Sequence, residues 1–236
     1  MPAPPCAHTV LNALRSVRAA AVFIVLTTTA GACSSQGAPP PPAEGAGGSR
    51  LAEPVALPPV TLTDQHGEPF HLVDDTPGRV TLLFFGYTNC PDICPVHMAN
   101  LAAVMRDLPF EITREVDVVF VTTDPERDTP ERLTEWLGAL HPRFTGLWGT
   151  RDEIHALEEA VGVVGSVVDP NTPAPDGGYF VGHAAQVLAF GPDDVAYVAY
   201  PWGTRQRDWI RDLPLLLGGT HPLMPSETST ESPAGV

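Results

Sequence analysis

The chain has 236 residues, of which 43% are hydrophobic, and carries 28 acidic side chains against 13 basic ones, for a formal net charge of −15 at pH 7. This balance excludes nucleic acid as the default partner, because a phosphate backbone binds basic surfaces. The length suffices for one folded domain with a substantial hydrophobic core.

The N-terminal segment, residues 1–33, is typical of an export signal. Two arginines precede an apolar stretch, Ala19–Leu26, and small residues follow it. The stretch is shorter than the roughly 20 apolar residues that span a bilayer. The sequence Ala-Gly-Ala before Cys33 satisfies the ordinary cleavage rule and also places Cys33 where a bacterial lipoprotein is acylated. We expect a lipid anchor at Cys33 on the extracytoplasmic face of the cell membrane; cleavage without acylation would give a secreted protein.

Two stretches of small and polar residues flank the part of the chain that can form a core. Residues 34–53 consist mainly of Pro, Ala, Gly and Ser, which predicts a disordered tether. Residues 219–236 predict a similar tail. A single folded domain is therefore expected at residues 54–218, tethered to the membrane through its N-terminus.

Within this domain, hydrophobic periodicity predicts alternating strands and helices. Residues 60–70 alternate around an Asp-Gln-His-Gly turn and predict a short hairpin. Continuous apolar runs predict buried strands, and apolar residues at helical spacing predict amphipathic helices. The expected strands are 80–85, 116–122, 144–148, 187–190 and 196–199; the expected helices are 95–108, one that starts at 128–131 and continues to 140, 153–161 and 206–217.

Cys90 and Cys94 lie where the first long strand gives way to its helix. This placement and the order of elements predict an α/β fold: a thioredoxin-like sandwich with a central mixed β-sheet flanked by helices and an added N-terminal β-hairpin. Thiols four residues apart on a helix share one face, so they can chelate one metal or close one disulfide. A helix start also lowers the pKa of a nearby thiol. The alternative is a purely structural disulfide, or two buried thiols that never react.

Three segments of the chain resemble the SCO/SenC family of copper-binding, thioredoxin-like proteins. Residues 86–95, with the sequence GYTNCPDICP, resemble the family's first motif, and residues 121–130, VTTDPERDTP, are similar to its second. Residues 179–185, YFVGHAA, align with the segment that supplies a histidine ligand. The resemblance covers about residues 57–217. It implies that Cys90, Cys94 and His183 bind one copper ion, as Cu(I), Cu(II) or both.

One position departs from the family pattern, and another offers a competing ligand. The family usually places Asp directly before the histidine, where this chain has Gly182; an outer-shell carboxylate normally orients a ligating imidazole. His97 follows Cys94 by three residues and could share its helical face. We expect His97 to be an exposed polar residue of the helix. Asp124 and Asp128 could form a carboxylate site, but turn and capping roles explain them better.

The resemblance implies a copper chaperone that delivers its ion to the CuA site of cytochrome c oxidase subunit II during assembly. Other copper chaperones or a thioredoxin-like reductant are further possible partners. The competing function is a thiol:disulfide oxidoreductase that keeps the CuA-site cysteines or other extracytoplasmic thiols reduced. The two functions share Cys90 and Cys94. They differ at His183, which copper binding requires and disulfide exchange does not.

Overall fold

A computed structural model describes residues 47–174 and 178–219. The strands are β1 (Ser49–Ala56), β2 (Thr61–Asp64), β3 (Pro69–His71), β4 (Val80–Gly86), β5 (Val116–Thr122), β6 (Phe144–Trp148), β7 (Val167–Pro173), β8 (Tyr179–Gly182), β9 (Val187–Phe190) and β10 (Val195–Tyr200). The helices are α1 (Ile93–Asp107), α2 (Phe110–Thr113), α3 (Pro130–Leu140), α4 (Arg151–Ala160) and α5 (Gln206–Leu217).

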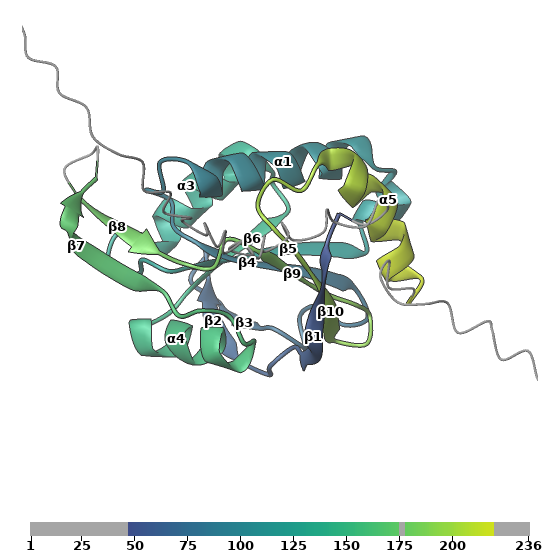
Figure 1. Cartoon of the computed structure of the whole chain (residues 1–236), viewed down its shortest axis with the longest axis horizontal. Coiled ribbons are helices and arrows are strands. Elements are labelled where there is room, and N and C mark those ends of the chain that lie inside the picture. The colour runs from purple at the N-terminus through teal and green to yellow at the C-terminus, as the bar shows by residue number, and fades with distance from the viewer. Residues whose placement is uncertain (1–46, 175–177, 220–236) are drawn as a thin grey trace, which may run out of the picture. The chain divides into compact units, whose positions relative to one another are not determined.

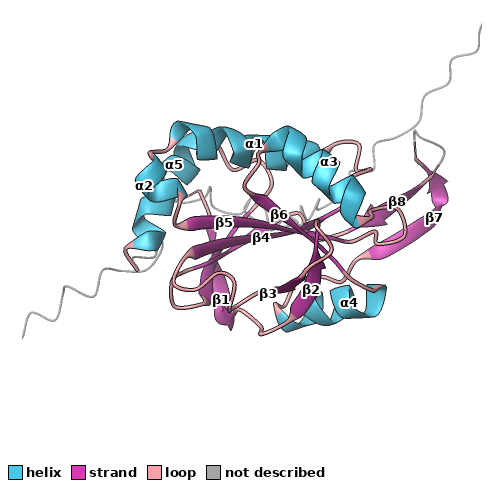
Figure 2. Ribbon diagram, turned by 180° about the vertical axis from the view of Figure 1, so that it is seen from behind, coloured by secondary structure: helices cyan, strands magenta, loops and turns pink. Residues whose placement is uncertain are grey.

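Eight of these strands form one mixed sheet in the order β1-β10-β9-β4-β5-β6-β2-β3, and β7 pairs with β8 in a separate two-stranded sheet. Strands β4, β5 and β6 run parallel, and β9 lies antiparallel against the other edge of β4. Helices α1, α3 and α5 cover one face of the sheet and α4 lies on the other (Figures 1 and 2). The predicted sandwich, including its N-terminal hairpin β2–β3, is confirmed.

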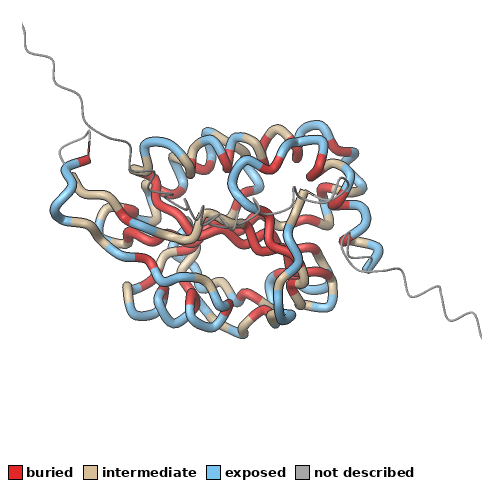
Figure 3. Tube along the Cα trace, in the orientation of Figure 1, coloured by how far each residue is buried: buried red, intermediate tan, exposed pale blue. Residues whose placement is uncertain are grey.

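The central strands are buried on both faces, as their continuous apolar sequences predict (Figure 3). Side chains alternate across the sheet, so Leu82 and Phe84 belong to the cluster under α1, α3 and α5. Their neighbours Leu83 and Phe85 belong to the cluster on the α4 face. Two hydrophobic layers therefore hold β4 in place, and its carboxyl end at Gly86 is a rigid starting point for the loop that carries the cysteines.

The tether prediction was wrong for residues 49–53. These residues belong to β1, which pairs antiparallel with β10 at the edge of the sheet. The composition suggested disorder, but the free backbone groups of β10 provide a partner that composition does not reveal. The signal, the remainder of the tether up to residue 46 and the tail from residue 220 lie outside the described residues.

The hairpin β7–β8 and the short helix α2 were not predicted. The hairpin extends from one end of the domain (Figures 1 and 2). Its first strand contains Pro170 and Pro173, which argue against a strand in a sheet interior. They are tolerated in β7, whose one partner among the described strands is β8. Among residues 47–174 and 178–219, no helix has the length and apolar character needed to cross a membrane.

Candidate metal centre

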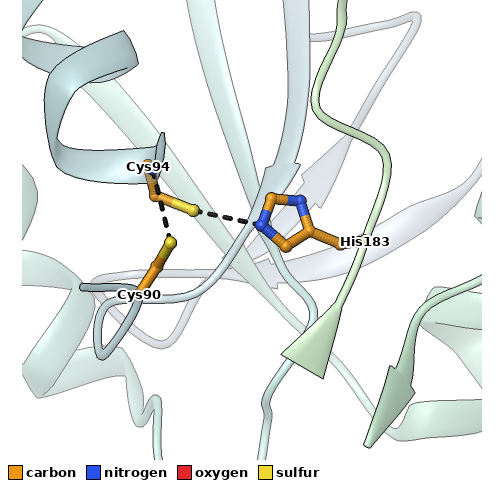
Figure 4. Close-up of side chains that lie close together, drawn as sticks. All are labelled: Cys90, Cys94 and His183. Carbon is orange, nitrogen blue, oxygen red and sulfur yellow. Dashed lines mark hydrogen bonds between the residues drawn. The ribbon is translucent and has the colours of Figure 1, made fainter. Parts of the chain in front are cut away.

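Three elements bring two sulfurs and one imidazole together at the carboxyl end of β4. Cys90 lies in the loop before α1, Cys94 lies in the first turn of α1, and His183 directly follows β8. The Cys94 Sγ lies 3.3 Å from the His183 Nε2, and the Cys90 Sγ accepts a hydrogen bond from the Cys94 backbone N–H at 3.5 Å (Figure 4). Their ligand atoms all lie within 4.8 Å of one another. The residues predicted from two separate motifs, 86–95 and 179–185, thus meet in one cluster.

The loop between β4 and α1, here called the cysteine loop, is held by hydrogen bonds to Asp128. Its carboxylate accepts hydrogen bonds from the Thr88 backbone N–H at 2.9 Å, the Thr88 hydroxyl at 2.6 Å and the Thr122 hydroxyl at 2.7 Å. Burial raises the pKa of Asp128, and the bonds from Thr88 and Thr122 oppose that rise. The helix-capping role belongs to Thr129, whose side chain accepts the Arg132 backbone N–H. The carboxylate of Asp128 therefore joins the ends of β4 and β5, a role that the capping interpretation missed.

Gly86 allows Cys94 to approach the sheet. A Cβ atom at Gly86 would lie 2.9 Å from the Cys94 Sγ, 3.0 Å from the Phe120 ring and 3.1 Å from the Phe84 ring. Such contacts are too short for carbon and sulfur atoms. The last residue of β4 must therefore lack a side chain for the sulfur to occupy its position.

The two thiols differ in their affinity for protons. The hydrogen bond from the Cys94 side chain, aided by the one from the backbone N–H of Cys94, lowers the pKa of Cys90 to about 3. Burial, together with the neighbouring Cys90 sulfur, raises the pKa of Cys94. At neutral pH the pair therefore holds one half-buried thiolate, Cys90, and one fully buried thiol, Cys94.

The His183 ring presents its Nε2 atom to the thiols. Its Nδ1 donates a hydrogen bond to the Ala184 carbonyl oxygen at 3.0 Å, which leaves the Nε2 lone pair directed at Cys94. The ring packs edge-on against Tyr87 and Phe84, with centroids 5.7 and 6.0 Å away. The backbone carbonyl of Ala184 thus orients the imidazole, and Gly182, directly before the histidine, has no side chain to do so.

His97 is buried, so the expectation that it decorates the exposed face of α1 was wrong. Its side chain is 3% exposed and stacks on the Phe84 ring with centroids 5.0 Å apart. The pKa of His97 is lowered to about 4 by burial, so its ring is neutral. Phe84 contacts both His97 and His183. Within the described ranges, the group of potential metal ligands around Cys90 and Cys94 includes His183 but not His97. Of these two histidines, His183 is the one whose ring nitrogen faces the thiols.

The cluster lies at a pocket of about 270 Å³. Apolar side chains of Tyr87, Pro91, Ile93 and Phe180 line it beside Cys90 and His183. Two sulfurs and one imidazole nitrogen form a soft donor set suited to copper or zinc, whereas calcium and magnesium require oxygen ligands. A metal held here would lie close enough to the surface for a partner to reach it.

The family model described as SCO1/SenC matches residues 51–217. The chain belongs to the SCO1/SenC family. A protein of Stutzerimonas stutzeri described as "Putative copper-binding protein" is 36% identical over 140 residues. These residues are 58% of this chain and 65% of that protein. The protein SenC of Rhodobacter capsulatus is 35% identical over 137 residues, which are 54% of this chain and 60% of that protein. The chain thus matches less than two thirds of the length of these two relatives.

Solved structures of this SCO1/SenC family share the fold. ScoI of Bradyrhizobium japonicum, solved with copper bound, has a TM-score of 0.59 and 29% identity, and the match covers 68% of this chain and 98% of that one. Yeast Sco1 with copper bound has a TM-score of 0.62 and 27% identity, with 72% of this chain and 92% of that one covered. These likenesses agree with the sandwich described above.

Sequence reasoning missed the residues that support the cluster. Asp128 holds the cysteine loop, Gly86 admits the sulfur, and the Ala184 carbonyl orients the imidazole. The second SCO/SenC-like motif contains Asp128, so the resemblance carried a signal for that residue. No sequence signal distinguishes a backbone carbonyl as the partner of His183.

Proposed function

We propose that this protein is an extracytoplasmic copper chaperone in which Cys90, Cys94 and His183 bind one copper ion. The observation that carries the proposal is the convergence of two sulfurs and an imidazole nitrogen within 4.8 Å of one another. Two thiolates and one imidazole match the preference of Cu(I) for soft ligands and can also hold Cu(II). The copper-bound relatives from Bradyrhizobium and yeast support copper over zinc.

Copper binding would make use of the unequal thiols. Cys90 is already a thiolate at neutral pH, so it can contact the ion first. Cys94 then releases its proton as its sulfur binds the metal. The Nδ1–H of His183 stays hydrogen-bonded to the Ala184 carbonyl oxygen, and Nε2 binds the metal without a change in the protonation of the ring. Each ion bound near neutral pH would therefore release about one proton.

The recipient in this proposal is the CuA site of cytochrome c oxidase subunit II, reached during assembly of the oxidase. Transfer would proceed by exchange of sulfur ligands, for which the pocket beside Cys90 offers access. A lipid anchor at Cys33 and a tether up to about residue 48 would keep the domain at the extracytoplasmic face of the membrane. Tethering raises the effective concentration of the domain near a membrane-embedded partner.

A second candidate function, thiol:disulfide exchange, is favoured by the unequal pKa values of the two cysteines. The Cys90 thiolate would attack a substrate disulfide to form a mixed disulfide, and Cys94 would resolve it, leaving a Cys90–Cys94 disulfide and a reduced substrate dithiol. A thioredoxin-like reductant would then restore the pair.

His183→Ala distinguishes the two functions. We expect the substitution to lower copper affinity strongly while the Cys90–Cys94 pair still cycles against a glutathione buffer. Cys90→Ser and Cys94→Ser should each abolish tight copper binding. Full copper affinity in His183→Ala, measured by competition with a chelator, would refute the ligand set.

A further inference from the structure

The strand that directly precedes His183 is not part of the main sheet. Strand β8 ends at Gly182, and in the described ranges its one strand partner is β7. The two cysteines, by contrast, stand on the buried strand β4 and on helix α1. On its C-terminal side His183 is four residues from Val187, where β9 pairs with β4. On its N-terminal side, contacts other than main-sheet hydrogen bonds must hold β8 beside the thiols.

Tyr179, the first residue of β8, makes three contacts with the loop that follows β5. Its hydroxyl donates a hydrogen bond to the Asp124 carboxylate at 2.7 Å, and its carbonyl oxygen accepts one from the Arg127 guanidinium at 2.9 Å. The guanidinium also lies over the Tyr179 ring, 3.8 Å from its centroid, and pairs with the Asp124 carboxylate. Phenol, guanidinium and carboxylate thus form a closed triangle in which each member contacts the other two.

This triangle is anchored to the main sheet. Asp124 is fully buried, and its backbone N–H donates to the Thr122 hydroxyl at the end of β5. The same Thr122 hydroxyl donates to Asp128, which holds the cysteine loop through Thr88. The loop that follows β5 therefore holds the cysteine loop through Asp128 and strand β8 through Asp124.

The geometry points to a positioning role: we propose that Asp124, Arg127 and Tyr179 form a clamp that holds His183 beside the two thiols and so raises the affinity for copper. The proposal rests on copper binding by Cys90, Cys94 and His183. The clamp residues act through β8, in which four positions separate Tyr179 from His183. Arg127 also reaches His183 through Tyr87. The Arg127 guanidinium lies 5.7 Å from the centroid of the Tyr87 ring, and that ring packs against His183.

Tyr179→Phe is the sharpest test, because it removes one hydrogen bond and keeps the ring on Arg127. Loss of a partner that orients a metal ligand typically lowers metal affinity about 10- to 100-fold, and we expect a loss near the lower end of that range. The matched control is Tyr197→Phe, which also removes a tyrosine–aspartate hydrogen bond, here to Asp193 on the β9–β10 hairpin. That hairpin carries no proposed ligand, so its variant should bind copper normally.

The measurement is Cu(I) affinity by chelator competition on the full-length, reduced protein in a Cys6→Ser, Cys33→Ser background, with each tyrosine variant made alone and combined with His183→Ala. If the clamp acts through the histidine, Tyr179→Phe lowers affinity about tenfold when His183 is present and has no further effect when it is absent. The midpoint of Cys90–Cys94 oxidation in glutathione buffers should not change.

An unchanged affinity in Tyr179→Phe, or an equal loss with and without His183, would overturn the clamp while leaving the ligand set intact. A loss in Tyr197→Phe as large as in Tyr179→Phe would also overturn it, since the effect would not be specific to β8. Unchanged affinity in His183→Ala alone would refute the ligand set and the clamp with it.

Discussion

Gly86→Ala tests whether the close approach of Cys94 to the sheet sets the metal centre. The added methyl would lie 2.9 Å from the Cys94 Sγ, 3.0 Å from Phe120 and 3.1 Å from Phe84. Comfortable contacts between such atoms are about 3.5–4.0 Å, so each neighbour would have to move by roughly 0.5 to 1 Å. Overpacking of this kind costs about 1–3 kcal/mol of folding free energy.

The sulfur is the neighbour that yields most easily. Both phenylalanine rings are fully buried within the cluster under α1, whereas the Cys94 sulfur can move by rotation about a single side-chain bond. We therefore expect the free energy of unfolding to fall by about 1 kcal/mol, at the low end of the overpacking range. Copper affinity should fall by at least about tenfold, because a ligand atom is displaced.

The assay combines urea unfolding, followed by circular dichroism, with chelator competition on the same samples. Gly138→Ala is the matched control: Gly138 is an exposed residue of α3, and a Cβ there meets no atom within 4 Å. That substitution should stabilise the helix by about 0.5–1 kcal/mol and leave copper affinity unchanged. Gly86→Ala with wild-type stability and wild-type copper affinity would refute the packing argument.

Three further substitutions or conditions test the support of the site. In reduced, metal-free protein, iodoacetamide should modify Cys90 at a rate that does not change between pH 8 and pH 5, because the pKa of Cys90 lies near 3. Buried Cys94 should stay unmodified. A steep fall in the rate of Cys90 modification over this range would contradict the lowered pKa. Asp128→Ala leaves the buried Thr88 N–H without its acceptor, so the free energy of unfolding should fall by about 2–4 kcal/mol in urea titrations; a loss below 0.5 kcal/mol, roughly the effect of a surface change, would contradict this role. There is room for Gly182→Asp, because the Val167 carbonyl oxygen lies 3.8 Å from the new Cβ. This substitution should tighten copper binding by up to about tenfold. Weaker binding would show that the Ala184 carbonyl orients His183 better than a carboxylate does.

The central strands and the cysteine pair could be predicted because their signals are local. The sequence of β4 is apolar throughout, which requires burial on both faces, and α1 begins within the segment that contains both thiols. The hairpin β2–β3 was likewise predicted from its turn residues. In each case the chemistry of neighbouring residues determines the element.

Elements that depend on distant partners could not be predicted in the same way. Strand β1 forms because β10 offers an open edge, and β7 tolerates two prolines because it pairs with one strand in the described part of the chain. His97 has helical spacing from Cys94 that fits a shared metal site, but spacing alone does not tell which face of α1 is covered by the sheet. The orientation of His183 depends on a carbonyl that any residue at position 184 would supply.

The proposed ligand set is tested most directly by the copper stoichiometry and affinity of the reduced protein in a Cys6→Ser, Cys33→Ser background, compared among the parent, His183→Ala and His97→Ala. We expect one tightly bound copper ion per chain, a strong loss of affinity in His183→Ala, and an unchanged ligand set in His97→Ala, where any effect is a loss of stability. Tight copper binding that survives His183→Ala and disappears in a folded His97→Ala variant would contradict this ligand set.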